Sequence, residues 1–497
     1  MDWLWLGVLF GGLLLIIFIS EVVRFHFGWS INVTRKFVHV STGFLITVAT
    51  LLLESSVPLI SIATVFIFVN YVAVKKHWLP GIHATKQISF GTFFYPISFL
   101  ILIVLLWGNY KSILITSILI MAISDAAAAI VGENIKAPLR YQFSGEPKSV
   151  QGSLVMFSLT FIIAFLGLQL ANWLEQASLT IVQRAWYAGV VAVLATAFES
   201  ISYKGSDNLS VPLGAAFSLH FLISHSPEQN LSFTIGIGLA LLVALLSYRF
   251  RFLSPSGAVA TFLLGSIVFG IGKWEFSLPL LLFFVLSSLI SKLGRNWKKK
   301  FADTFQKGGQ RDIGQVFANG GVAGAIVLLG NYFPSDVWYF IFVGSIAGVT
   351  ADTWGTELGV FSKTMPRLIL NYKTVLPGTS GGVTWLGFFG GLTGSAVIVF
   401  LGSLATKKYE VVPKKLMLLI VLIGLLGSIV DSIIGATIQA QYKCPNCSQV
   451  TEKKKHCQFF ETRLISGLSF VDNDMVNAAC ALSSAAFSFL AYLMVIK

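Results

Sequence analysis

Apolar residues occupy most of the chain in long runs, and short polar segments separate one run from the next. We identify about sixteen such runs, near residues 3–20, 37–53, 57–74, 92–107, 112–132, 152–171, 185–200, 211–224, 231–248, 255–271, 277–292, 314–331, 338–358, 383–404, 415–436 and 475–496. A run of roughly 17–25 apolar residues spans a bilayer as an α-helix, and a shorter run fits a half-helix or a re-entrant segment. The pattern predicts an all-α polytopic integral membrane protein with about 14–16 transmembrane helices.

The composition indicates the same class, since 55% of the residues are hydrophobic, 11% are charged and the mean hydropathy is +0.79. The net charge of +13 would suggest nucleic acid as the partner of a soluble protein. Here we interpret it as the excess of Lys and Arg that cytoplasmic loops carry. With the N-terminus outside and the runs alternating, those loops hold 27 of the 35 Lys and Arg residues. We therefore expect the bilayer and no nucleic acid as partner, in a prokaryotic cytoplasmic membrane with the polar loops facing the cytoplasm.

One polar motif interrupts the apolar pattern of the first half. Asp125 closes an apolar run, where an uncompensated carboxylate is costly. Lys148, Ser149, Gly152 and Ser153 follow in a short loop before the next run. A carboxylate can hold hydrated Mg²⁺, and a lysine beside glycine-flanked amides at a helix start can hold phosphate. The motif predicts a site for a metal-bound nucleotide at the membrane surface.

The second half repeats this arrangement. Asp352 lies seven residues before Gly359, as Asp125 lies seven residues before Gly132. The polar residues that follow Asp352 are Glu357, Lys373, Thr374, Gly378, Thr379 and Ser380. Two ordered sets at similar spacing indicate two related halves. We place the boundary in the short polar segment after residue 225, which predicts domains over 1–225 and 226–497.

Further polar residues of the first half arrive at the same predicted surface. Arg35 and Lys36 start a span, and His39 lies one helical turn farther along about the same face. Basic residues at that place also fit simple anchoring to the cytoplasmic side. Glu199 ends a span, and Asp207 and Asn208 precede the next, where a turn or a helix cap is the other interpretation.

The second half has polar residues of its own. Arg311 precedes a span, whereas Asp431 and Asp472 lie close to span ends. Four residues in the loop at 443–458 have the spacing of a Cys₃His zinc site, namely Cys444, Cys447, His456 and Cys457. A cytoplasmic loop makes a disulfide improbable, so structural zinc is the preferred interpretation and redox chemistry or no metal the other.

The first half resembles a known family. The motifs R-K-x-x-H, S-D-A-A-A-x-x-x-G, P-K-S-x-x-G-S and D-N-L-S-V-P occur in this order over about residues 20–225. They look like those of the CTP-dependent polyprenol kinases, which include dolichol kinase and phytol kinase. The resemblance implies transfer of the γ-phosphoryl group of CTP to an isoprenoid alcohol of the phytol, geranylgeraniol or farnesol type. The family often has Glu where this chain has Gln151.

The second half resembles another membrane family over about residues 231–495. The motifs A-D-T-W-x-T-E-L-G, P-G-T-S-G-G-V, D-S-I-I-G-A-T-x-Q and D-N-D-x-V-N are similar to those of proteins that include plant phytyl-phosphate kinase. This resemblance implies phosphorylation of an isoprenoid monophosphate to the diphosphate. Together the two resemblances suggest a bifunctional kinase, in which the product of the first half is the substrate of the second.

Roles for the first-half residues follow as a hypothesis. Asp125 would hold Mg²⁺, together with Glu199 or Asp207. Arg35 and Lys36 would neutralise the transferring group, and His39 or a carboxylate would accept the alcohol proton. The nucleotide phosphates would be held by Lys148, Ser149, Gly152, Ser153, Asp207 and Asn208.

In the second half, Arg311 would meet the incoming monophosphate. Mg²⁺ would be held by Asp352 and Glu357 with Asp431 or Asp472. The nucleotide phosphates would be held by Lys373, Thr374, Gly378, Thr379 and Ser380.

Two other function classes fit the same sequence features. A lipid cytidylyltransferase also needs CTP, Mg²⁺ and a lipid phosphate, but it releases pyrophosphate. A transporter also has paired repeats and intramembrane charges. The polar groups gather at one predicted membrane face instead of the midplane, which favours an enzyme.

Overall fold

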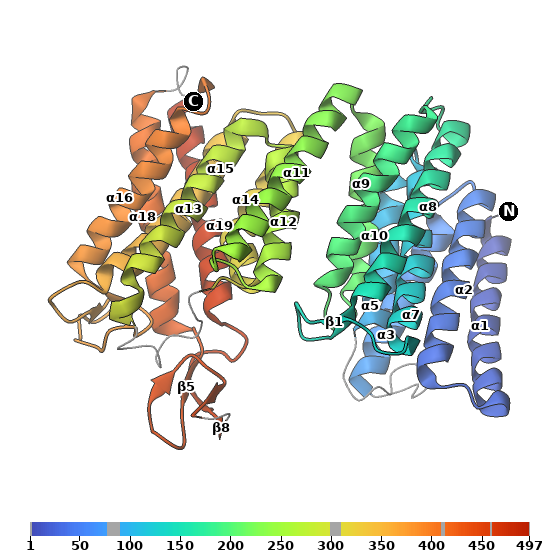
Figure 1. Ribbon diagram of the computed structural model, residues 1–497, viewed down its shortest axis with the longest axis horizontal. Coiled ribbons are helices and arrows are strands. Elements are labelled where there is room, and N and C mark those ends of the chain that lie inside the picture. The colour runs from blue at the N-terminus through green and yellow to red at the C-terminus, as the bar shows by residue number, and fades with distance from the viewer. Residues whose placement is uncertain (1, 77–89, 299–309, 409–412, 458–459, 497) are drawn as a thin grey trace. The chain divides into compact units, whose positions relative to one another are not determined.

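The computed structural model describes residues 2–76, 90–298, 310–408, 413–457 and 460–496. The chain forms two compact units, Met1–Asn230 and Leu231–Lys497, so the division falls in the first turn of the helix Pro227–Arg249. Figure 1 shows both units as bundles of helices joined by short connections.

Helices make up nearly all of the first unit. They are α1 (Asp2–Phe27), α2 (Ile31–Leu52), α3 (Val57–Lys76), α5 (Gly91–Leu106), α6 (Lys111–Leu119), the π-helix η1 (Ile120–Asp125), α7 (Ala126–Asn134), α8 (Val150–Leu174), α9 (Ile181–Ser200) and α10 (Asp207–Ser224). The strands β1 (Arg140–Tyr141) and β2 (Lys148–Ser149) pair as an antiparallel hairpin between α7 and α8.

The second unit has a similar make-up with more strand. Its helices are α11 (Pro227–Arg249), α12 (Pro255–Gly270), α13 (Lys273–Lys298), α14 (Ile313–Tyr332), α15 (Val337–Gly359), α16 (Trp385–Ser403), α18 (Lys414–Thr437) and α19 (Asn473–Ile496). Its strands are β3 (Arg367–Leu368), β4 (Gly382–Val383), β5 (Gln441–Lys443), β6 (Val450–Thr451), β7 (Lys455–His456), β8 (Phe460–Glu461) and β9 (Arg463–Ser466). β3 pairs with β4 between α15 and α16, β7 pairs with β8, and β6-β5-β9 form a small sheet between α18 and α19.

The helices confirm the predicted all-α membrane fold, and each predicted apolar run falls on one of them. Within the described residues, ten helices are long and apolar enough to cross a membrane, and α3, α5 and α12 contain shorter apolar helices. α2, α10 and α15 are absent from both groups, and these three carry Arg35, Asp207 and Asp352. The total of 14–16 spans stays a prediction.

Close packing around the π-helix η1 shapes the first unit. Ile118 and Ile120 are fully buried there. α2 approaches very closely, because a Cβ atom on Gly43 would lie 2.4 Å from the Cβ atom of Ala122. Only glycine allows that approach, and it sets α2 against the residues just before Asp125.

The two units share a local element, in which a helix, a β-hairpin and a second helix follow one another. Ser149 caps the second helix of the first unit, and its Oγ accepts a hydrogen bond from the Gly152 N–H at 3.0 Å. Thr384 does the same in the second unit, where its Oγ1 accepts from the Gly387 N–H at 3.0 Å. Such caps satisfy amide groups that a helix start leaves unpaired.

Each cap packs against a glycine near the end of the preceding helix. A Cβ atom on Gly132 would lie 2.7 Å from the Ser149 Oγ, and one on Gly359 would lie 3.2 Å from the Thr384 Oγ1. In both units, the glycine seven residues after the aspartate therefore packs on the cap of the following helix.

Candidate functional site

A cavity of about 730 Å³ lies in the first unit, within the size range of small-molecule sites. Leu9, Leu13 and Glu21 of α1 all line it, and α1 rises about 18 Å over those twelve residues. Apolar side chains of α1 and α3 line one part of the cavity. Asp125, Lys148, Glu199 and Asp207, among other polar residues, line the rest. The cavity is thus suited to a ligand with a long apolar tail and an anionic head.

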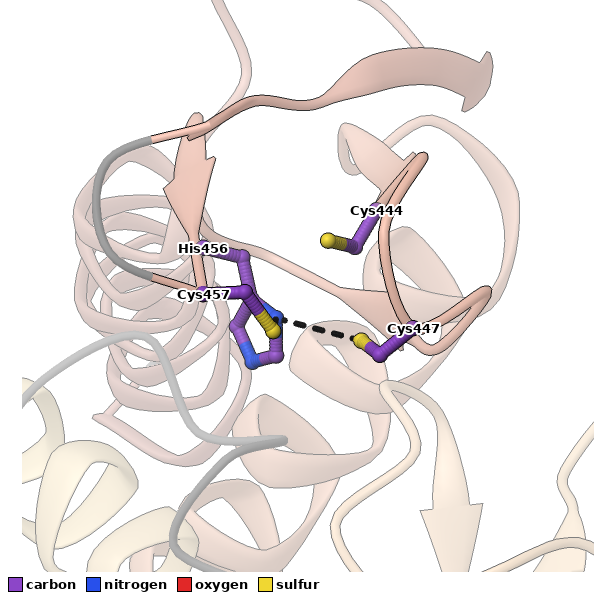
Figure 2. A group of neighbouring side chains, drawn as sticks. All are labelled: Cys444, Cys447, His456 and Cys457. Atoms are coloured by element: carbon purple, nitrogen blue, oxygen red, sulfur yellow. Dashed lines mark hydrogen bonds between the residues drawn. The ribbon is translucent and has the colours of Figure 1, made fainter.

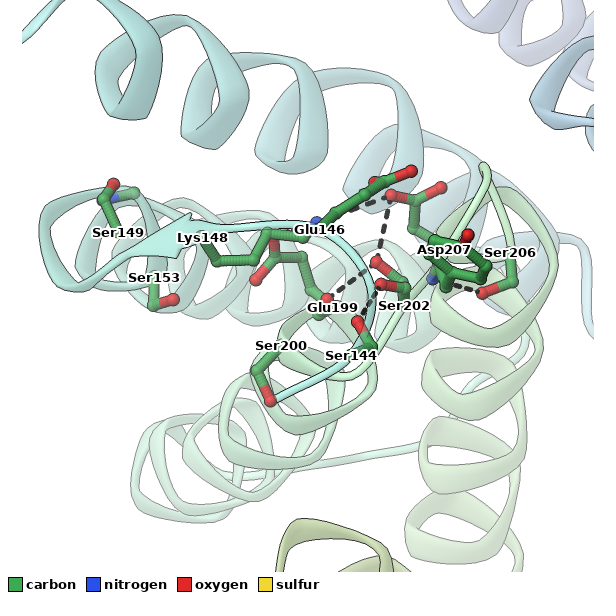
Figure 3. A network of polar contacts seen from close by, with 12 residues as sticks. Ser144, Glu146, Lys148, Ser149, Ser153, Glu199, Ser200, Ser202, Ser206 and Asp207 are labelled. Atoms are coloured by element: carbon green, nitrogen blue, oxygen red, sulfur yellow. Dashed lines mark hydrogen bonds and ion pairs between the residues drawn. The ribbon is translucent and has the colours of Figure 1, made fainter. Parts of the chain in front are cut away.

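Lys148 is the centre of the polar part. Its Nζ lies 2.7 Å from the Glu199 Oε1 and 3.7 Å from the Asp207 Oδ2. Figure 3 shows these side chains meeting where the β1–β2 hairpin folds against the connection between α9 and α10. The Ser144 Oγ, which donates to the Ser202 carbonyl at 2.7 Å, ties the hairpin to that connection.

Three carboxylates surround Lys148. Burial alone would lower the pKa of Lys148, but Glu199, Asp207 and Asp125 together raise it above its ordinary value. Glu199 is only 5% exposed, and its buried Oε2 has no hydrogen-bond partner within the described residues. Carboxylate oxygens are what Mg²⁺ binds, so this group of acidic side chains fits a divalent cation.

α2 brings its predicted residues to the same cavity. The Lys36 Nζ pairs with the Glu133 Oε2 at 2.9 Å, and Arg35 lies within electrostatic reach of Asp207. The His39 Nε2 lies 3.1 Å from the Met121 carbonyl oxygen, and its ring packs edge-on against Tyr95. Glu133 also lines the cavity, and it was not among the predicted residues although it lies about two helical turns after Asp125.

Four residues predicted to bind nucleotide phosphate also line this cavity, namely Ser149, Gly152, Ser153 and Asn208. Some of their polar groups already have partners. The Ser153 Oγ and the Tyr141 hydroxyl lie 2.6 Å apart, and the Ser149 Oγ caps α8. The Asn208 Oδ1 is buried without a hydrogen-bond partner in the described part of the chain.

The structure brings together only part of the predicted metal set of the second unit. Asp352 and Asp431 lie close enough together for their carboxyl groups to interact electrostatically. Glu357 is instead buried against α13, where its Oε1 accepts from the Ser291 Oγ at 2.7 Å. Asp472 caps α19, since its Oδ1 accepts from the Met475 N–H at 3.1 Å. Asp352 and Asp431 form the acidic centre of this unit.

Arg311 lies among aromatic side chains. Its guanidinium lies 5.2 Å and 5.5 Å from the ring centres of Phe283 and Phe284. Burial lowers the pKa of Arg311 to about 10, although Glu357 acts in the opposite direction. The cavity beside it, of about 40 Å³, is far smaller than the cavity of about 730 Å³ in the first unit. Contact between Arg311 and a substrate phosphate stays a prediction.

Lys373 is not the structural counterpart of Lys148. The equivalent helix caps are Ser149 and Thr384, so the position that corresponds to Lys148 is Val383. Lys373 lies exposed ten residues earlier, and its N–H donates to the Asn371 Oδ1 at 3.1 Å. The predicted parallel between the two lysines is wrong, because the second hairpin is longer than the first.

The other predicted phosphate ligands of the second unit lie in the connection between β3 and β4. The backbone of Thr374 forms an isolated antiparallel β-bridge with that of Arg367. The Thr379 Oγ1 donates a hydrogen bond to the Leu376 carbonyl at 2.8 Å. Gly378 has φ +88°, a value that suits glycine. The Ser380 Oγ donates to the Glu452 Oε1 at 2.5 Å. The sequence gives no sign of that contact, because Glu452 lies inside the Lys-rich segment 451–455.

The cysteine and histidine residues of the second unit meet as predicted. Ligand atoms of Cys444, Cys447, His456 and Cys457 all lie within 4.8 Å of one another, and Figure 2 shows the side chains turned toward a common centre. Tetrahedral sulfur ligands about 2.3 Å from zinc lie roughly 3.8 Å apart, so a small adjustment closes the site. The cluster can bind a metal ion.

Hydrogen bonds already prepare the thiols for different charge states. The Cys447 backbone N–H lowers the pKa of Cys444 to about 6, so this thiol ionises at neutral pH. The side chain of Cys447 raises the pKa of Cys457 to about 11. A bound metal ion would compete with the proton for Cys457, because cysteine coordinates as the thiolate.

We predict that the purified protein carries about one zinc ion per chain, the amount that a single Cys₃His site holds. Cys447→Ser should remove most of that zinc, because it takes away one of four ligands. Cys480→Ser is the matched control, since Cys480 is buried in α19 outside the cluster. Metal analysis by mass spectrometry measures both, and equal zinc in the two variants would contradict the assignment.

A second prediction concerns the ion pair of the first unit. Lys148→Met should destabilise the protein by roughly 3 kcal/mol, because it leaves Glu199 buried without its charge partner. The double variant Lys148→Met/Glu199→Gln should regain much of this loss. Lys136→Met provides the control, as Lys136 is exposed. Thermal unfolding in detergent measures the series, and a double variant no more stable than Lys148→Met would refute the pairing argument.

Comparison with known proteins adds a family. Residues 238–485 match the family described as Integral membrane protein DUF92. Protein PGR of Arabidopsis thaliana is 34% identical over 273 residues, which cover 51% of this chain and 92% of that protein. A phytol kinase of Synechocystis sp. is 34% identical over 193 residues, which cover 37% of this chain and 77% of that protein.

A third relative is an uncharacterized membrane protein of Methanocaldococcus jannaschii. It is 29% identical over 215 residues, which cover 43% of this chain and 85% of that protein. No solved structure matches the chain. The matched family region lies within the second unit, and the similarity to protein PGR spans nearly all of that relative. The chain therefore belongs to the DUF92 family of integral membrane proteins.

Proposed function

We propose that the first unit transfers the γ-phosphoryl group of CTP to the hydroxyl of an isoprenoid alcohol, and that the second unit phosphorylates the resulting monophosphate. The cavity of about 730 Å³ is the observation that carries the first step. It combines an apolar part along α1 and α3 with the charged residues around Lys148. Similarity to a phytol kinase supports the same chemistry, since phytol is an isoprenoid alcohol.

The apolar part suits a lipid tail. Leu9, Leu13 and Ile17 of α1 line it, and Leu59 and Phe66 of α3 do so as well. Burial of apolar tail surface there contributes about 25 cal/mol per Å² to binding. A tail that lies along α1 would place the alcohol hydroxyl near the start of α2 and the β1–β2 hairpin.

The polar part would bind and orient the phosphates. In the transfer, the alcohol oxygen forms a bond to the γ-phosphorus, the bond to the bridging oxygen breaks, and CDP leaves. Lys148 and Arg35 would offset the phosphate charge. Mg²⁺, when bound, would neutralise charge on the triphosphate, and Asp125, Glu199 and Asp207 would hold it.

The alcohol proton needs an acceptor. The His39 Nε2 faces the Met121 carbonyl oxygen, which can only accept a hydrogen bond. In the neutral ring the proton therefore sits on Nε2, and Nδ1 carries the free lone pair. His39 can thus accept the alcohol proton at Nδ1, and a carboxylate of the cavity is the other candidate base.

The second step rests on the element that the units share. Asp352 occupies the position of Asp125, and the Thr384 cap repeats the Ser149 cap. The pair Asp352–Asp431 would hold the cation of this unit. Because Lys148 has no counterpart there, the phosphates would be bound by the segment 378–382 and the start of α16.

The proposal can be tested with purified protein in detergent, Mg²⁺ and γ-labelled CTP. Geranylgeraniol should yield labelled monophosphate, and geranylgeranyl monophosphate should yield labelled diphosphate. Asp125→Asn should lower the first rate at least 100-fold and spare the second, whereas Asp352→Asn should do the reverse. Each variant keeps the volume of the side chain it replaces.

The outcomes separate the alternatives. If the monophosphate is labelled and the diphosphate is not, the second step is refuted. Release of pyrophosphate with a CDP-lipid product would identify a cytidylyltransferase. A folded protein that turns over neither lipid would favour a transporter.

A further prediction concerns the tail site. Leu13→Trp should raise the KM for geranylgeraniol several-fold more than for the shorter geraniol, because the indole would fill the apolar part of the cavity. Leu14→Trp is the control, as Leu14 is 49% exposed and Leu13 only 8%. Equal changes for both alcohols, or for both variants, would show that the tail does not bind along α1.

A further inference from the structure

We propose that Glu452 is a positioning residue of the second unit, held in place by the metal ion of the Cys/His cluster. On this view the ion orders the segment 378–382, which the proposed second step uses for phosphate. The inference rests on that proposed step for its effect on activity. Its structural part, the coupling of the metal to the segment, stands without it.

Two of the four metal ligands share a hairpin with Glu452, and the other two, His456 and Cys457, follow it by four and five residues. β5 and β6 pair with Tyr442 opposite Thr451, and Glu452 comes directly after Thr451. Cys444 and Cys447 lie in the turn between the two strands, where the Cys444 N–H donates to the Gln449 carbonyl at 3.0 Å. A metal ion that fixes this turn therefore also fixes the strand that ends at Glu452.

Glu452 reaches from this hairpin to two residues outside it. Its Oε1 accepts from the Ser380 Oγ at 2.5 Å and from the Gln439 Nε2 at 2.9 Å. Gln439 is 3% exposed and lies two residues after the end of α18, the helix that carries Asp431. Glu452 also lies close enough to Asp431 for their charges to repel. One carboxylate thus connects the metal hairpin with the segment around Ser380 and with the end of α18.

The segment that contains Ser380 packs tightly on α18. Gly381 has φ +76°, and a Cβ atom there would lie 2.5 Å from the Ala436 Cβ and 2.7 Å from the Ser432 carbonyl oxygen. Only glycine fits this place. Ser380 is thereby held between α18 on one side and Glu452 on the other.

The hairpin belongs to a very small sheet. Its strands β5 and β6 have three and two residues, β9 adds four more beside β5, and a sheet of this size cannot bury a core of its own. Small Cys/His domains are ordered by their zinc ion. Loss of the ion would free the hairpin, withdraw Glu452 and leave Ser380 and Gln439 without their acceptor.

Hydrogen exchange in the full-length protein in detergent tests this coupling. Glu452→Ala and Cys447→Ser should each raise amide exchange over residues 376–384 several-fold, and exchange in the β1–β2 hairpin should not change. Glu452→Gln should stay near wild type, because its amide oxygen still accepts both hydrogen bonds. Glu461→Ala is the matched control, since Glu461 is exposed on β8 in the same loop region.

Zinc content and activity complete the test. Glu452→Ala should retain its zinc, which distinguishes the effect of the carboxylate from loss of the metal. Its kcat for the monophosphate should fall, while its rate on the alcohol stays constant. Unchanged exchange over 376–384 in Glu452→Ala, or in the zinc-free Cys447→Ser variant, would overturn the inference. If wild type phosphorylates no monophosphate, the proposed second step fails, and the exchange data alone decide the coupling.

Discussion

The pairing of buried charge organises the first unit. Glu199 lies at the end of a membrane helix with almost no exposure to solvent, and a lone carboxylate there would be costly. Lys148 supplies the partner, but it belongs to a different part of the chain. To deliver it, the β1–β2 hairpin must fold over the end of the helix bundle. The shape of that end, and the cavity below it, follow from this requirement.

Much of the membrane architecture could be predicted from the sequence, because apolar runs of this length are typical of membrane-spanning helices. The meeting of Asp125, Lys148, Glu199 and Asp207 was also foreseeable. Lys148, Glu199 and Asp207 lie at or beside run ends, which alternating spans return to the same side, whereas Asp125 lies in the second half of the run 112–132. The sequence did not show which polar atoms are already engaged, as with Glu357, since that depends on neighbours far along the chain.

The failure at Lys373 has a physical cause. The prediction matched the two lysines by their distance from the aspartate, which assumes that both hairpins have the same length. Gly132 and Ser149 are 17 residues apart, however, whereas Gly359 and Thr384 are 25 apart. Longer loops cost little free energy, so an insertion is easily accepted. The packing of glycine against the helix cap is the constant feature. A comparison anchored on the cap, instead of on the lysine, aligns the two units.

The π-helix before Asp125 has a consequence for how this site can change. A π-turn holds one residue more than an α-turn, so it accommodates an extra residue while the helix on either side keeps its facing. If the turn tightened to regular α geometry with every residue kept, the side chains after it would rotate by about 100° around the helix axis relative to α6. Asp125 and Glu133 would then leave the cavity, while the apolar surface of α6 stayed in place. Deletion of one residue within 120–124 would instead straighten the helix and keep Asp125 on its side, so the wide turn sets the direction of the charged site independently of the buried packing that precedes it.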